Sequence, residues 1–207
     1  MSFYTSLNGL KNAQTDLGVI AHNIANVETN GFKKSRVEFA DIVAGSAYTN
    51  PKLMQGIGAT VTAIQQNFSL GPVEQTGSAL DLAINGDGFF TTKSPVTGQT
   101  YYTRNGGFSV DEQGFIHDGD DNRLQAFPVD ATGAVSSTTP GDVQVPATNT
   151  AGSEFAGLIV NADGGIVASF ADGSNQVIAK VALASFIAPT GLEQTGSSNW
   201  QATGLSG

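Results

Sequence analysis

The sequence contains no cysteine, which excludes a disulfide framework, a thiol nucleophile and a thiolate metal site. Charged residues are scarce as well: they make up 13% of the chain, and only nine of them are Lys or Arg. Nucleic-acid binding needs clustered basic side chains that neutralise phosphates, whereas the formal net charge here is −9. We therefore expect neither a nucleic-acid partner nor binding to an anionic membrane surface.

Long apolar runs are also missing. No run approaches the roughly 18–20 residues that a membrane-spanning helix needs. The N-terminus has no basic region followed by an apolar one, so we expect no cleaved secretory signal. The protein then either stays inside the cell or leaves by a route that cleaves no signal.

Glycine is abundant, with 26 residues, and Ser, Thr, Asn and Gln are frequent too. Pairs in which Asp or Asn precedes Gly recur from residue 87 onward and separate short runs of strand-forming residues, as in successive β-hairpins. The expected strands are 101–103, 108–110, 115–117, 124–129, 158–160, 166–170 and 177–186. We predict a mainly β fold with an N-terminal α-helix: one half of a coiled coil, followed by an antiparallel β-rich domain of short hairpins.

The first 24 residues carry a stripe with the four-three spacing of a coiled-coil seam. Five members of the stripe are large and apolar, one is a small alanine and one is a polar glutamine. We call this set the apolar stripe; it consists of Phe3, Leu7, Leu10, Gln14, Leu17, Ala21 and Ile24. No later segment shows a long helix of matching period. The stripe therefore predicts an interface for assembly with other subunits.

Periodicity alone leaves one alternative open, in which the stripe packs on the chain's own β domain. The period of 3.5 residues favours a helical partner instead. Gly9 and Gly18 lie inside the expected helix, and each costs about 1 kcal/mol relative to Ala. Because an isolated helix of this length is marginal in water, we expect it to be disordered or frayed in the free subunit and to form when partner helices cover the stripe.

The pattern along the chain predicts four segments: a helix over 1–30, an extended connection over 31–78, an antiparallel β domain over 79–190 and a C-terminal segment over 191–207. The stretch 136–153 is rich in Ser, Thr, Pro, Ala and Gly and has little hydrophobic character. It is typical of a surface loop that would tolerate an inserted domain.

Three groups of polar residues are candidates for chemical sites, and each lacks the required spacing. The Gly-Asp-Gly motif at 86–88 has neither the lysine nor the helix of a phosphate-binding loop, so a tight turn explains it better. The acidic run 118–122 lacks the alternating ligands and the closing Glu of a calcium loop. His22 and His117 are far apart and have no spaced acidic partner. We predict no catalytic residue, no metal site, no cofactor and no small-molecule substrate.

Several motifs resemble the bacterial flagellar rod and hook protein family. The segment 17–36, LGVIAHNIANVETNGFKKSR, is similar to the N-terminal signature of that family. Further motifs follow in the family's order at 79–90 (ALDLAINGDGFF), at 102–110 (YTRNGGFSV) and over 180–207, so the resemblance covers most of the chain. The residues that we assign to the N-terminal family motif are Asn23, Asn26, Asn30, Gly31 and Phe32.

The resemblance implies a structural axial subunit that polymerises with itself. Within the family, MSFYTSLNGL and SRVEFADIVAGS look most like the hook, a tubular universal joint that transmits torque; a distal or proximal rod subunit of the basal body is the alternative. The resemblance further implies contacts with neighbouring axial proteins, the hook cap and the export apparatus. It places the protein in the hook or basal body, extracellular or spanning the periplasm, after type III export without a cleaved signal.

Two features depart from the family pattern. Family members end in a C-terminal helix that pairs with the N-terminal one, a helix that we expect beyond Gly207. Hook proteins also carry an outer domain inserted in the β region, for which the passage 140–153 leaves almost no room.

An alternative of another class is a secreted β-rich adhesin or polysaccharide-acting protein. Such a protein would share the Asp-Gly turns and would show calcium-dependent stability or a carboxylate cleft.

Overall fold

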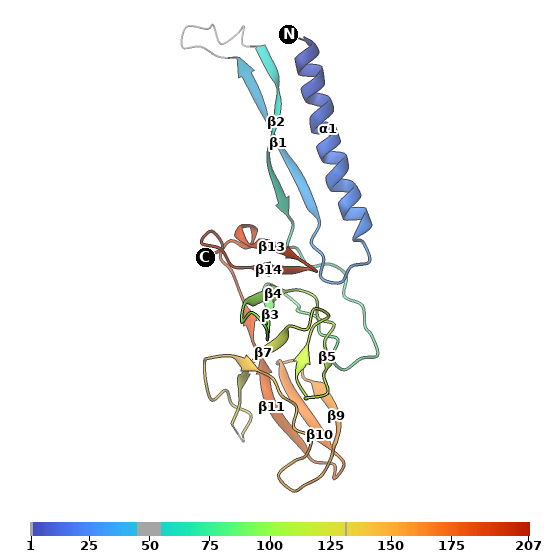
Figure 1. Ribbon diagram of the computed structural model, residues 1–207, viewed down its shortest axis with the longest axis vertical. Coiled ribbons are helices and arrows are strands. Elements are labelled where there is room, and N and C mark those ends of the chain that lie inside the picture. Colours follow the sequence, from blue (N-terminus) through green and yellow to red (C-terminus); the bar gives the residue numbers. More distant parts are fainter. Residues whose placement is uncertain (1, 45–54, 131) are drawn as a thin grey trace. The chain divides into compact units, whose positions relative to one another are not determined.

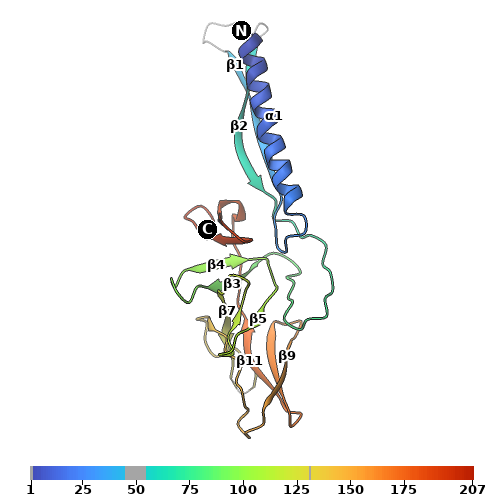
Figure 2. The same cartoon turned by 45° about the vertical axis from the view of Figure 1, so that its right-hand side comes forward.

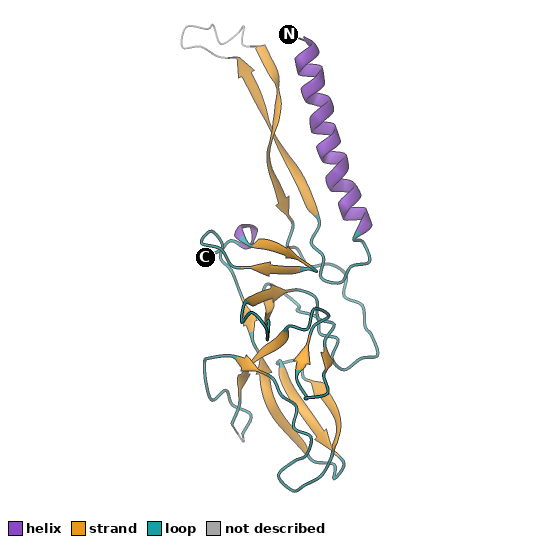
Figure 3. Cartoon of the chain, in the orientation of Figure 1, coloured by secondary structure: helices purple, strands orange, loops and turns teal. Residues whose placement is uncertain are grey.

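The structure is a computed structural model that describes residues 2–44, 55–130 and 132–207. Within these residues it contains one α-helix, α1 (Ser2–Ala25), one 3-10 helix, η2 (Pro189–Gly191), and otherwise antiparallel β-strands (Figure 3). The prediction of a mainly β fold with an N-terminal helix is confirmed. No helix in this described part is long and apolar enough to cross a membrane.

The chain divides into two compact units. The first, which we call the helix–hairpin unit, comprises Met1–Thr29 and Lys33–Ser69. The second, which we call the β unit, comprises Asn30–Phe32 and Leu70–Gly207.

The helix–hairpin unit consists of α1 and the antiparallel strands β1 (Ser35–Ala44) and β2 (Gln55–Gln66). Ser35 lies opposite Gln66, and the register shifts at two β-bulges. The helix packs along both strands (Figure 1 and Figure 2). The segment 31–78, expected as an extended connection, therefore folds back on itself where the structure describes it; its residues 45–54 lie outside the described part.

The β unit is built on one sheet of twelve strands, all paired antiparallel. Its main path runs β13-β14-β4-β3-β7-β11-β10-β9; β12 pairs with β3, β6 joins β5 to β7, and β8 pairs with β7. The strands are β3 (Phe89–Lys93), β4 (Thr100–Thr103), β5 (Ser109–Val110), β6 (Ile116–His117), β7 (Arg123–Pro128), β8 (Gly141–Asp142), β9 (Phe155–Val160), β10 (Gly165–Phe170), β11 (Asn175–Val181), β12 (Leu183–Ala184), β13 (Glu193–Gly196) and β14 (Asn199–Gln201).

Three of the predicted Asp-Gly hairpins are present: those at Asp118, Asp163 and Asp172 connect β6 to β7, β9 to β10 and β10 to β11. The Asn-Gly pair at Asn105 was expected to join a hairpin, but β4 and β5, which flank it, pair with other strands. Gly106 instead approaches the backbone of Leu82, whose N–H donates to the Gly106 carbonyl at 2.9 Å. This glycine is needed because a side chain there would collide with the Leu82 carbonyl.

The interior of the β unit is apolar. One cluster gathers Phe90, Phe108, Ile116, Leu124 and Ile166. A second group is aromatic: the ring of Phe89 meets those of Trp200 and Phe186 edge to face, each at a centroid distance of 5.7 Å. Edge-to-face aromatic pairs add to the stabilisation that burial of their area provides.

Two segments contribute more to the β unit than their composition predicts. The C-terminal stretch 191–207, expected only as a lead into a further helix, supplies β13, β14 and the fully buried Trp200. The stretch 136–153, expected as a surface loop, supplies β8 and buries Val143 and Val145 in the core. Both exceptions follow from one or two apolar side chains inside otherwise polar sequence.

Candidate assembly interface

The side of α1 that contacts its own hairpin is polar. Thr5 Oγ1 donates to the carbonyl of Ile57 at 3.4 Å, and Asn23 makes two bonds with Ser35: its Nδ2 donates to the Ser35 carbonyl at 2.7 Å, and the Ser35 N–H donates to its Oδ1 at 2.9 Å. Between them, two further carboxamides bind β2. We call this set the polar face of α1; it consists of Thr5, Asn8, Asn12 and Asn23.

The two central carboxamides share one acceptor. Asn8 Nδ2 lies 3.0 Å and Asn12 Nδ2 lies 2.8 Å from the carbonyl oxygen of Ala59. The acceptor follows a β-bulge, where Gly58 has a φ of +137° and Ile57 has no partner in the register of β1. A Cβ at Gly58 would lie 2.9 Å from Asn8 Nδ2. The backbone of β2 is therefore shaped to receive these side chains, and a bulge is a common device for such local redirection.

The apolar stripe is exposed. The exposed fractions are 73% for Phe3, 67% for Leu10, 65% for Leu17 and 67% for Ile24. The helical period explains this result, because Thr5 and Asn12 lie on the side of a 3.6-residue helix opposite Leu10 and Leu17. The alternative in which the stripe packs on the chain's own strands is not what the described structure contains.

Burial of these exposed side chains against a partner would be strongly favourable in free energy. Full burial of one large apolar side chain stabilises a protein by roughly 1.5–3 kcal/mol, and the stripe has five of them. Further exposed apolar residues on or beside the helix include Tyr4, Ile20 and Val27. Contiguous apolar surface that stays exposed in one chain marks a site of interaction.

The first two residues of the family motif act at the C-terminal end of α1. Asn23 ties the helix to the start of β1, as described above. Asn26 Nδ2 donates to the carbonyl of His22 at 2.9 Å, and Thr29 Oγ1 donates to Asn26 Oδ1 at 3.2 Å. These bonds satisfy groups in the last turn, where a helix leaves backbone carbonyls without partners.

The other three motif residues, Asn30, Gly31 and Phe32, belong to the β unit. Gly31 has a φ of +72°, and a Cβ there would lie 2.5 Å from the backbone nitrogen of Asn105. Both the left-handed conformation and the close approach require glycine. Phe32 is half-buried, whereas Asn30 is exposed. The structure thus separates the five motif residues into two groups with different roles.

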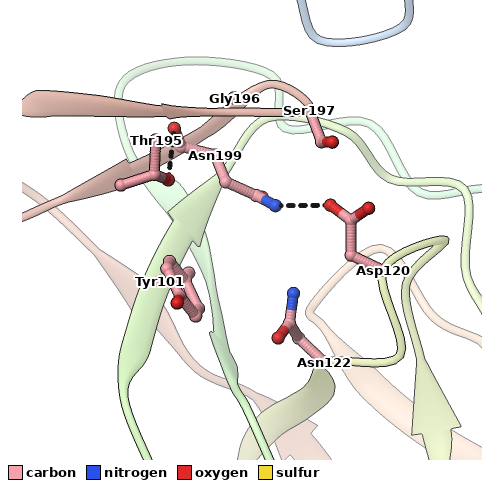
Figure 4. Close-up of a pocket in the computed structure, with 7 residues that line it drawn as sticks. All are labelled: Tyr101, Asp120, Asn122, Thr195, Gly196, Ser197 and Asn199. Carbon is pink, nitrogen blue, oxygen red and sulfur yellow. Dashed lines mark hydrogen bonds between the residues drawn. The ribbon is translucent and has the colours of Figure 1, made fainter. Parts of the chain in front are cut away.

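A polar hollow of about 290 Å³ lies in the β unit (Figure 4). Asn199 Nδ2 donates to Asp120 Oδ2 at 2.9 Å, and Thr195 Oγ1 donates to the Asn199 carbonyl at 3.1 Å. The first bond ties the β13–β14 hairpin to the turn between β6 and β7, and the second lies within the hairpin. The lining residues are Tyr101, Asp120, Asn122, Thr195, Gly196, Ser197 and Asn199.

The remaining candidates from the sequence have structural roles. In the acidic run, Asp118 Oδ1 accepts from the N–H groups of Asp120 and Asn122, both at 2.9 Å, so this carboxylate organises its own turn. His22 and His117 lie in different units. Over residues 2–44, 55–130 and 132–207, no group of three or more His, Cys, Asp or Glu side chains could hold a metal ion.

Two family profiles match the chain. One, described as the flagellar hook protein FlgE/F/G D1 domain, matches residues 83–168; the other, described as the flagella basal body rod protein, matches residues 3–33. The flagellar basal-body rod protein FlgG of Bacillus subtilis is 35% identical over 208 residues, which cover 95% of this chain and 71% of that relative. The chain belongs to the flagellar hook and rod protein family.

Hook members of the family are similar over a smaller part. The flagellar hook protein FlgE of Salmonella typhimurium is 38% identical over 148 residues, 72% of this chain and 34% of that relative. FlgE of Escherichia coli is 35% identical over 150 residues, 72% of this chain and 35% of that relative. The chain therefore spans about a third of the length of these hook proteins, and the predicted resemblance to the hook and rod family is confirmed.

The sequence pattern reveals the apolar stripe and Asn23, but not the other three residues of the polar face. Polar residues on an amphipathic helix normally face solvent, so the pattern gives no reason to assign contacts to Thr5, Asn8 and Asn12. The signal that could have found them is the i, i+4 spacing of two asparagines on the side opposite the stripe. Asparagine is a poor helix former, and a pair of them inside a helix needs a reason.

Proposed function

We propose that this protein is a structural axial subunit of the bacterial flagellum that polymerises with copies of itself through the apolar stripe. The exposure of Phe3, Leu10, Leu17 and Ile24 supports the proposal most directly. Coiled-coil spacing suits helices that interlock side chain by side chain. Helices of other subunits are therefore among the occupants of the stripe, and Gln14 within the seam sets the register of pairing at some cost in stability.

The proposed mechanism is mechanical. Helices of many subunits pack into an inner tube, and the β units pack sideways around it. Contacts between different surfaces of one subunit do not close on themselves and generate an open helical polymer. The β unit contributes polar, weakly charged surface, in keeping with the 13% charged residues of the chain. Surfaces of this kind can slide past each other as the polymer bends.

We assign the polymer to the hook, with neighbouring axial proteins, the hook cap and the type III export apparatus as partners. The opening MSFYTSLNGL and the stretch SRVEFADIVAGS support the hook. A rod subunit is the second candidate, favoured by the alignment with FlgG over 95% of this chain and 71% of that relative. Complementation separates them, because expression of the full-length gene should restore either a strain without its hook protein or a strain without its rod protein.

The substitution Leu10→Asp tests the role of the stripe. We expect it to abolish polymerisation and to leave the β unit folded, because a charge cannot be buried in an apolar seam without a partner. Sedimentation and electron microscopy measure the polymer, and Trp200 fluorescence reports on the β unit. The matched control is Gly9→Asp, which adds the same charge one residue away, where a Cβ meets no atom within 4 Å. Unchanged polymer yield from Leu10→Asp would refute the proposal.

The alternative class, a secreted adhesin or polysaccharide-acting protein, predicts stability that depends on calcium. Thermal melting with and without a chelator tests this directly. We expect coincident melting curves, since the Asp118 carboxylate is already occupied by backbone donors. A large loss of stability in chelator would favour the adhesin.

A further inference from the structure

We propose that Asn8 and Asn12 are positioning residues for assembly: their carboxamides hold α1 in the rotation about its own axis that turns the apolar stripe away from the hairpin. This inference rests on the proposed function of the stripe as the polymerisation surface. The role assigned here to Asn8 and Asn12, to fix the rotation of α1, does not follow from exposure or helical period alone.

The shared acceptor makes this contact sensitive to rotation of the helix. Asn8 and Asn12 are one helical turn apart, and both donate to the single carbonyl oxygen of Ala59, at 3.0 Å and 2.8 Å. Hydrogen bonds weaken steeply as their angles depart from linearity. A helix rolled about its axis would move both donors off the acceptor together, so the pair senses rotation more sharply than one bond would.

The hairpin is fitted to this arrangement. Gly58, which follows the bulge at Ile57 with a φ of +137°, has no side chain, and a Cβ there would lie 2.9 Å from Asn8 Nδ2. At the other end of the helix, the two bonds between Asn23 and Ser35 fix the same rotation. The helix is therefore held at two places, more than two turns apart, by directional bonds to backbone groups of the hairpin.

Directional hydrogen bonds are needed because apolar contacts favour another arrangement, in which the stripe packs on the hairpin. Burial of apolar area is non-directional, and the hairpin itself offers aliphatic side chains such as Ile57 and Ile64, which are 41% and 53% exposed. If α1 rolled its stripe onto these side chains, the single chain would hide the surface that assembly uses. In that state the Ala59 carbonyl would lose both carboxamide donors and would be covered by apolar side chains, which is unfavourable.

The test is the double variant Asn8→Ala/Asn12→Ala. Because Ala is the better helix former, a defect cannot come from a weaker helix. We expect the concentration required for polymerisation to rise about tenfold, the factor that corresponds to the loss of two weak hydrogen bonds. Circular dichroism should show that helix content is retained. The matched control is Lys11→Ala, an exposed position on the same turn outside both faces, which should polymerise like the wild type.

The rotation of α1 can be measured directly with a thiol introduced into the stripe. Since the sequence has no cysteine, Gln14→Cys places a single thiol in the stripe, and its reaction with a maleimide measures exposure in the monomer. We expect slower labelling in the Asn8→Ala/Asn12→Ala background than in the otherwise wild-type background. Equal labelling, or wild-type polymerisation of the double variant, overturns the inference.

The outcome of Leu10→Asp distinguishes the two proposals. If Leu10→Asp abolishes polymerisation and the double asparagine variant does not, the inference fails while the proposed function stands. If Leu10→Asp itself polymerises, the proposed function fails. Should the double variant lose its helical signal, the single variant Asn12→Ala keeps the bond from Asn8 and gives the same comparison; wild-type labelling and polymerisation of that folded single variant would overturn the inference.

Discussion

The β unit has an apolar interior, in which Trp200 and Ile116 are fully buried. In the helix–hairpin unit, the long apolar side chains of α1 lie outside and its asparagines lie inside. Phe3 is 73% exposed, whereas Asn12 is half-buried and bonded to the hairpin. Large apolar side chains are therefore buried in the interior of the β unit but exposed on α1.

The difference separates folding from assembly. An apolar interior stabilises the β unit within one chain, since apolar burial is the dominant favourable contribution to folding. The helix–hairpin unit uses side-chain to backbone hydrogen bonds within the chain, each of which contributes only about 0.5–1.5 kcal/mol. The apolar stripe stays exposed in the single chain, and we propose that other subunits cover it. Substitutions in the two regions should therefore differ in what they damage.

The largest loss of monomer stability is expected for Trp200→Ala. This side chain is fully buried and meets Phe89 edge to face. Truncation of a buried Trp or Phe typically costs about 3–5 kcal/mol, and chemical denaturation followed by circular dichroism would measure it. The paired variant Leu10→Ala should change monomer stability by less than about 0.5 kcal/mol, as exposed positions do. Comparable losses from both variants would contradict the comparison.

Gly31→Ala should destabilise the protein less than Trp200→Ala. An L-residue in the left-handed region costs about 1–2 kcal/mol, and here the added methyl group also meets the backbone of Asn105. The matched control is Gly9→Ala, which lies inside α1 with open space around it. That substitution should stabilise the helix by about 1 kcal/mol. Thermal melts of the two variants should shift in opposite directions, and a shift of the same sign would argue against the assigned backbone conformation.

Acid should affect the β unit before it affects the contacts of α1. A hydrogen bond from Ser174 Oγ, then those from the Ser174 N–H and the Asn149 carboxamide, hold the pKa of the Asp172 carboxyl well below its usual value. Because the folded-state pKa is the lower one, this stabilisation is complete above the unfolded value of about 4 and is lost as pH falls below it.

The carboxamides of the polar face do not titrate, so the helix–hairpin hydrogen bonds themselves should persist through the same pH range. Melts followed by Trp200 fluorescence at pH 7 and pH 3 measure the loss in the β unit. The variant Asp172→Asn should show a smaller acid-induced loss than the wild type. An identical loss in both proteins would exclude Asp172 as a source of the pH dependence.

The sequence predicts elements well where one period dominates. The helix Ser2–Ala25 follows from the apolar stripe, and β10 and β11 follow from apolar runs beside Asp-Gly turns. The hairpin β13–β14 could not be found this way. Its turn residues, Ser197 and Ser198, have φ values of +50° and +58°, a conformation that Asn-Gly or Gly would normally signal.

Of the proposed assembly site, the sequence reveals the apolar stripe but not the contacts on the opposite side of α1. A stripe at coiled-coil spacing reveals which side chains seek an apolar partner, but it does not reveal what the opposite side contacts. The partner of Asn8 and Asn12 is a backbone carbonyl made accessible by a bulge in β2. Backbone groups leave no trace in the sequence pattern, so this contact depends on the fold of the hairpin. The expected fraying of the helix in the free subunit remains a prediction.

The most direct test compares the single thiol of Gln14→Cys in the monomer and in the polymer. We expect fast maleimide labelling in the monomer, because the stripe is exposed, and strong protection in the polymer, because helices of other subunits cover it. Labelling that is slow already in the dilute monomer, or equally fast in the polymer, would contradict the claim that this stripe is the assembly surface.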